Sequence, residues 1–180
     1  MVPSNLTNFF LASSDAGGAL IGLLFVAVSI DPEKISSTHA SLDRQAVAAS
    51  AFTALVNAFF ISLGGLIPGN LGWIALIMSI LGVLNSLSLG KQIIHKSSDR
   101  VNFFRRFLLL FLSMVIYLAE FYFAFQLVLH PHAYVNAYTL AGFLIGVYAI
   151  GLVRAWELLG VKRFGFLSWL NPLKEMKKEN

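Results

Sequence analysis

The chain has 180 residues, of which 57% are apolar and only 12% are Asp, Glu, Lys or Arg. A soluble domain is about 25% charged, and a fold this small leaves much of its surface in water. The composition therefore excludes an ordinary soluble enzyme, a disordered chain and a coiled coil. It predicts an all-α polytopic membrane bundle. The chain has no cysteine, which excludes disulfides, thiol chemistry and thiolate metal sites.

Five apolar segments follow one another along the chain, and we expect each to form a transmembrane helix. Each has 20 to 23 residues, enough for an α-helix to cross about 30 Å of hydrocarbon. Together they predict a single transmembrane domain over residues 1–180, with 161–180 as a cytoplasmic tail at the membrane interface. The expected helices are about 9–30, 46–67, 71–90, 107–129 and 138–160.

The basic residues lie in alternate loops, which predicts the orientation. Twelve of the thirteen lie in the loops after the first and third segments and in the tail, and Arg154 alone lies within a span. Basic loops stay in the cytoplasm, so we expect the N-terminus outside and the C-terminus inside. The net charge of +4 then reports topology, and no nucleic-acid partner is expected. The twelve are Lys34, Arg44, Lys91, Lys96, Arg100, Arg105, Arg106, Lys162, Arg163, Lys174, Lys177 and Lys178.

Small residues at a spacing of four indicate where helices approach closely, because lipid tails supply no hydrophobic drive between helices. Five such helix-packing residues are Ser14, Gly18, Gly22, Gly142 and Gly146. Aromatic residues instead crowd segment 107–129. We therefore expect the other four helices to form a tight bundle, with the fourth span peripheral or facing another subunit. Plain packing accounts for these small-residue faces without any functional role.

Ionisable residues inside a bilayer are expensive, at about 2.5–3.5 kcal/mol or more at a helix centre. Arg154 and Glu157 form a pair near the cytoplasmic end of the last span, at i and i+3. This pair has either a purely structural role or a role as an inner gate or a partner contact.

Asp15 and Glu120 lie deeper, about 9 Å and about 13 Å from the outer ends of their spans. Asn57 falls in the same layer. The spacing of Asp15 with Gly18 and Gly22 predicts that it points into a helix contact. Two close carboxyls in low dielectric share a proton or bind a cation, so the three residues are candidates for an ion or proton site. A neutral acid that holds the bundle in register is the alternative.

Catalytic and metal-binding patterns are weak. No Ser/His/Asp set or phosphate-binding glycine loop occurs, and His130 and His132 have no third ligand nearby. We therefore expect no enzyme, no metal and no cofactor, although an intramembrane enzyme stays open because such hydrolases use few residues.

The run GLLFVAVSI at 22–30, followed by a short charged loop and a second apolar span, resembles a group of small bacterial integral membrane proteins. Some members carry the label "modulator of FtsH protease". The similarity covers about Phe9 to Leu66 and includes an acidic residue early in the first helix, to which Asp15 corresponds. The resemblance implies a multi-pass protein of the bacterial inner membrane with a membrane protease as partner. It carries over no catalytic residues.

Two functions follow as expectations. The first is a non-enzymatic protein that acts through intramembrane helix contacts, by self-assembly as a homo-oligomer or by modulating a membrane partner. The second is an oligomeric ion or proton channel or transporter that uses Asp15 and Glu120 with Asn57. The lipid bilayer is the surrounding medium in both.

Overall fold

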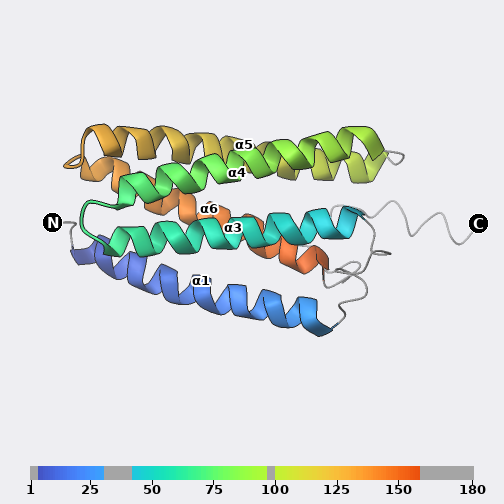
Figure 1. Cartoon of the computed structure of the whole chain (residues 1–180), viewed down its shortest axis with the longest axis horizontal. Helices are drawn as coiled ribbons and strands as arrows, with labels where there is room; N and C mark the ends of the chain where they lie inside the picture. The colour runs from blue at the N-terminus through green and yellow to red at the C-terminus, as the bar shows by residue number, and fades with distance from the viewer. Residues whose placement is uncertain (1–3, 31–41, 97–99, 159–180) are drawn as a thin grey trace, which may run out of the picture.

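The computed structural model describes residues 4–30, 42–96 and 100–158, and these ranges hold five helices and no strand (Figure 1). All five are long and apolar enough to cross a membrane, which confirms the predicted all-α fold. Their bounds are α1 Ser4–Ile30, α3 Leu42–Leu66, α4 Leu71–Lys96, α5 Arg100–Leu129 and α6 Tyr134–Leu158. The predicted tail 161–180 lies outside the described residues.

Several helices extend beyond the apolar segments. α1 begins at Ser4 rather than Phe9, α4 runs on to Lys96, and α5 begins at Arg100. Hydropathy marks only the part of a helix that suits hydrocarbon, whereas the backbone hydrogen bonds continue through polar turns at the ends. A turn at 67–70 joins α3 to α4. Gly69 adopts φ 82° there, a conformation that favours glycine.

The helices alternate in direction, so their ends collect in two groups (Figure 1). One end of the bundle holds the two turns without Lys or Arg, at 67–70 and 130–133. The other end holds the last residues of α1, α4 and α6 and the first residues of α3 and α5. The segments rich in Lys and Arg flank the helices at this second end.

Four helices form a closed ring, in which α3 packs on α4, α4 on α5, α5 on α6 and α6 on α3. α1 lies outside this ring, against α3 and α6 (Figure 1). The prediction that the fourth span is peripheral is therefore wrong, because α5 packs along the whole of α4 and α1 is the peripheral helix. The prediction relied on the aromatic residues of this span. Phe111, Tyr122 and Phe125 point out of the bundle, however, while small residues of α5 face inward.

The α4–α5 contact is built from small residues at alternating spacings of three and four. On α4 these are Gly72, Ala75, Ser79, Gly82 and Ser86, all buried. The facing residues of antiparallel α5 are Ser113, Tyr117, Glu120, Ala124 and Leu127, also buried. A spacing of alternating three and four keeps these residues along one side of each helix, and the small side chains allow the two backbones to approach closely.

α1 docks through a similar stripe and through one polar cluster. Its buried residues include Leu6, Phe10, Ser13, Gly17 and Leu24. The Ser13 hydroxyl lies 2.7 Å from the Ser62 hydroxyl of α3. The Tyr148 hydroxyl of α6 donates a 2.6 Å hydrogen bond to the Ser13 carbonyl. This cluster joins the peripheral helix to both of its neighbours.

Replacing Tyr148 with Phe is expected to lower the free energy of unfolding by roughly 1 kcal/mol, the size of an interhelical hydrogen bond in a membrane protein. The measurement is denaturant unfolding in mixed micelles. Tyr122→Phe is the matched control, since its exposed hydroxyl accepts a bond only from Gln126 on the same helix. Equal stability losses in the two variants would show that the cluster does not hold α1.

Candidate functional site in the core of the bundle

Glu120 of α5 and Asn57 of α3 meet inside the ring, and both are 0% exposed. The Asn57 amide nitrogen Nδ2 donates one hydrogen bond of 3.3 Å to Glu120 Oε2. It donates a second, of 3.2 Å, to the backbone carbonyl oxygen of Met78 on α4. The pair therefore joins three helices at the centre of the fold, and the two residues share one layer as predicted.

Further polar side chains continue from this pair. Ser79 of α4 is fully buried, and its hydroxyl donates to the Leu76 carbonyl one turn back. Tyr117 lies one turn from Glu120 on α5, and its ring fills the space left by Gly82, where an added Cβ would be 2.6 Å from ring carbon Cδ1. Tyr117 is within electrostatic range of both Glu120 and Arg154.

The glutamate–asparagine pair leaves two buried oxygens without a hydrogen-bond partner in the structure. They are Asn57 Oδ1 and Glu120 Oε1. A buried polar atom without a partner costs about 1–3 kcal/mol, and more when it is charged. Native structures therefore seldom leave such atoms unpaired without a reason.

Asp15 does not join this site. It is exposed on α1, whereas Glu120 is fully buried in the ring. The prediction that Asp15 points into a helix contact is wrong within this chain. Ser13 and Gly17 are buried, and residues two positions away lie about 200° around the helix. Asp15 consequently points directly away from the bundle.

The pair at the end of α6 separates into two environments. Arg154 is buried, at 5% exposed, and faces into the ring, whereas Glu157 is half-buried. Arg154 interacts electrostatically with Tyr117, next to the candidate site.

The predicted helix-packing residues have mixed outcomes. Ser14 is buried, and a Cβ at Gly18 or Gly146 would contact Phe59 at 3.7 Å or Ile116 at 3.2 Å. Nothing lies within 4 Å of a Cβ at Gly22 or Gly142, so neither lines a contact within the chain. A line of residues at a spacing of four drifts by about 40° per step, which carries it off the buried stripe.

Four glycines that permit close approaches were missed by the spacing-of-four rule. They are Gly17, Gly64, Gly65 and Gly151, and at each an added Cβ would lie within 3.0 Å of a side chain on another helix. Gly17, together with Leu6, Phe10, Ser13 and Leu24, belongs to a repeat of alternating three and four. A search for that repeat would have found it.

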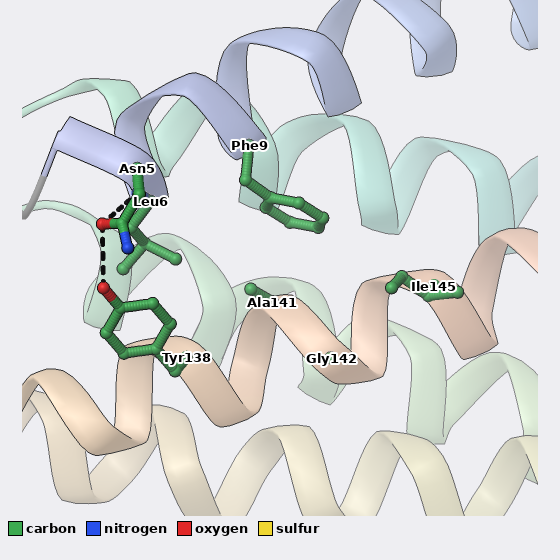
Figure 2. A pocket seen from close by; sticks show the side chains of 7 residues that line it. All are labelled: Asn5, Leu6, Phe9, Tyr138, Ala141, Gly142 and Ile145. Atoms are coloured by element: carbon green, nitrogen blue, oxygen red, sulfur yellow. Dashed lines mark hydrogen bonds between the residues drawn. The ribbon is translucent and has the colours of Figure 1, made fainter.

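A cavity of about 200 Å³ lies between the first turns of α1 and the first half of α6 (Figure 2). Its walls are mainly apolar and include Phe9, Ala141 and Ile145, and Gly142 leaves one side open. The Tyr138 hydroxyl donates a 2.8 Å hydrogen bond to Asn5 Oδ1 at its rim (Figure 2). The cavity holds no buried ionisable group and supports no chemistry of its own.

The chain matches no protein-family model, no curated protein and no solved structure. Within the described ranges, no three His, Asp or Glu side chains gather where they could hold a metal ion. The described ranges hold five helices that are long and apolar enough to cross a membrane, as the helices of polytopic α-helical membrane proteins are.

Proposed function

We propose that the protein is a multi-pass protein of the bacterial inner membrane that acts, without catalysis, through intramembrane helix contacts. The orientation is N-terminus outside, as the positions of the basic residues indicate. The observation that carries the proposal is the exposure of Asp15 on the side of α1 that faces away from the bundle.

The outward side of α1 is a narrow stripe of small and polar side chains, here called the outer α1 face. Its members recur at alternating spacings of four and three, and all are exposed: Asn8, Ala12, Asp15, Ala19, Gly22 and Val26. This is the spacing with which α1 contacts its own neighbours on the opposite side. The outer α1 face thus has the pattern of a second helix–helix seam.

A carboxyl group on a surface that faces lipid tails costs about 2.5–3.5 kcal/mol or more. The adjoining exposed residues Leu11, Leu23 and Phe25 suit lipid, but Asp15 does not. A helix laid over the outer α1 face would remove the carboxyl from the lipid and give it hydrogen-bond partners. Small neighbours at Ala12 and Ala19 would let that helix approach closely.

The occupant that we propose is α1 of a second copy. Copies in one membrane insert with the same orientation, so two α1 helices related by a two-fold axis run parallel and residues of equal depth meet. Asp15 then faces Asp15 of the partner, where two carboxyls satisfy each other by sharing a proton. The resemblance of 9–66 to proteins labelled as protease modulators makes a membrane protease the alternative occupant.

An oligomeric ion or proton channel that uses Asp15, Glu120 and Asn57 together is the second candidate. The buried pair of Glu120 and Asn57 favours an ion-linked role, since it has unpaired oxygens. Asp15, however, points out of the chain, so one chain does not form a site with two carboxyls. Proton flux into liposomes, lost with Glu120→Gln in a folded protein, would support this candidate.

Self-association is tested by crosslinking in native membranes. The chain has no cysteine, so Ser4→Cys places a single thiol at the exposed outer end of the outer α1 face. We expect a disulfide-linked dimer. Adding Ala19→Leu is expected to lower its yield about tenfold, the effect of roughly 1.4 kcal/mol.

Ala149→Leu is the matched control, because Ala149 is exposed on α6 and the same change there leaves the outer α1 face intact. Asp15→Asn should keep the dimer, because amides also pair. A folded Ser4→Cys protein that yields only monomer would overturn self-association. A crosslink to a different membrane protein would favour the protease as occupant.

A further inference from the structure

We infer that Glu120 and Asn57 form a proton-binding site, in which a protonated Glu120 donates a hydrogen bond from Oε1 to Asn57 Oδ1. The site lies inside one chain and is independent of the contacts proposed for α1. Its ligand is a single proton, held between α3 and α5.

The hydrogen-bond inventory of the pair leads to this assignment. An asparagine amide has two N–H donors and one carbonyl oxygen. Both donors of Asn57 are used, one on Glu120 Oε2 and one on the Met78 carbonyl. Asn57 Oδ1 therefore needs a donor from another group, and Glu120 Oε1 is the other unpaired oxygen.

A proton on Oε1 satisfies both oxygens at once. The two hydrogen bonds, Nδ2–H to Oε2 and Oε1–H to Oδ1, then close a ring between acid and amide. An ionised carboxylate has only acceptors, so it would leave both Oε1 and Oδ1 unpaired. It would also place a charge in the centre of the bundle, where the penalty is several kcal/mol.

Among the described residues, no charged side chain acts directly on Glu120 to hold it ionised. α3 contributes Asn57 and α4 contributes the Met78 carbonyl and Ser79, all uncharged. On α5 the neighbouring titratable group is Tyr117, and on α6 the charged group is Arg154, which interacts electrostatically with Tyr117. Among the described residues, Asn57 is the side chain that hydrogen-bonds Glu120.

A metal cation fits the same place poorly. Mg²⁺ and Ca²⁺ take about six to eight oxygen ligands, whereas the pair offers two unpaired oxygens. The Ser79 hydroxyl next to it is already bonded to the Leu76 carbonyl. The geometry points to a proton, which needs one donor atom and one acceptor atom.

The hydrogen bond from Glu120 Oε1 on α5 to Asn57 Oδ1 on α3 forms only when the proton is present. The proton therefore helps to hold α3 against α5. Tyr117 and Arg154 lie between Glu120 and the end of the bundle flanked by the basic segments.

Infrared difference spectroscopy of the protein in liposomes at neutral pH tests the assignment. The spectrum of the wild type minus that of Glu120→Gln is expected to contain the carbonyl band of a hydrogen-bonded carboxylic acid, which shifts in deuterium oxide. Asp15→Asn should leave that band in place, which separates it from the carboxyl of Asp15 on α1.

A second variant keeps Glu120 and changes only its partner. In Asn57→Leu the acid band is expected to move to the position of a carboxylic acid without a hydrogen bond, because an apolar neighbour further disfavours the ionised form. Carboxylate bands from Glu120 in the wild type would overturn the proposal, and so would an Asn57→Leu spectrum identical to the wild type. Carboxylate bands that change with added Na⁺ or K⁺ would assign the site to a cation instead.

Discussion

Replacing Gly65 with Val is expected to lower the free energy of unfolding by about 1–3 kcal/mol or more, the range for overpacking a filled core. A Cβ at Gly65 would fall on the ring of Phe10, which is 0% exposed. That ring has little room to move, because it also packs edge-on against Phe9 at 5.7 Å between centroids. The new side chain would therefore push α1 away from α3.

Gly142→Val provides the matched control for this loss. Both glycines lie within helices, but nothing lies within 4 Å of a Cβ at Gly142, which opens onto the cavity between α1 and α6. We expect its stability to equal or exceed that of the wild type, since valine is a better helix former than glycine. Unfolding of both variants in mixed micelles measures the difference. Equal stabilities would contradict the close approach of Phe10 to α3.

The second large effect is expected at the buried polar pair. Asn57→Leu removes the hydrogen-bond partner of Glu120 and leaves a carboxyl unpaired in an apolar core, which costs about 1–3 kcal/mol. Glu120→Leu likewise leaves the Asn57 amide with its bond to the Met78 carbonyl but without Glu120 as a partner. Each single variant should therefore unfold at a lower denaturant concentration than the wild type.

The double variant Asn57→Leu/Glu120→Leu should be less destabilised than the sum of the two single variants. Replacing both partners of a buried polar pair by apolar groups of similar size is often close to neutral. A double-mutant cycle from unfolding free energies measures this coupling. Ser113→Ala, a change at a buried hydroxyl bonded only to its own helix, is the comparison. Additive losses at Asn57 and Glu120 would show that the two side chains do not interact.

The sequence by itself determined the number of helices, their membrane-spanning length and the layer in which the polar residues lie. These properties follow from local rules: apolar length sets a span, and a rise of about 1.5 Å per residue sets depth. Glu120 and Asn57 were assigned to one layer in this way, and they are hydrogen-bonded. The small-residue seam of α4 was also visible, because its five residues keep to one helix face.

Only the tertiary structure decided which way each helix faces. A shift of one residue in the choice of the buried stripe turns a helix by about 100°, and the sequence offers several stripes on the same helix. Ser14, Gly18 and Gly22 appeared to mark the contact face of α1, but the face that packs contains Ser13 and Gly17. Asp15 therefore shares the depth of Glu120 and not its site.

The position of α5 in the bundle was likewise decided by the tertiary structure and not by the sequence. Its aromatic residues suggested a peripheral helix, yet the ring is closed by contacts of α5 with α4 and α6. Depth is a property of one helix, whereas rotation and neighbours depend on how residues far apart in the chain fit together. The pairing of Glu120 with Asn57 across 63 positions of sequence is a result of that fit.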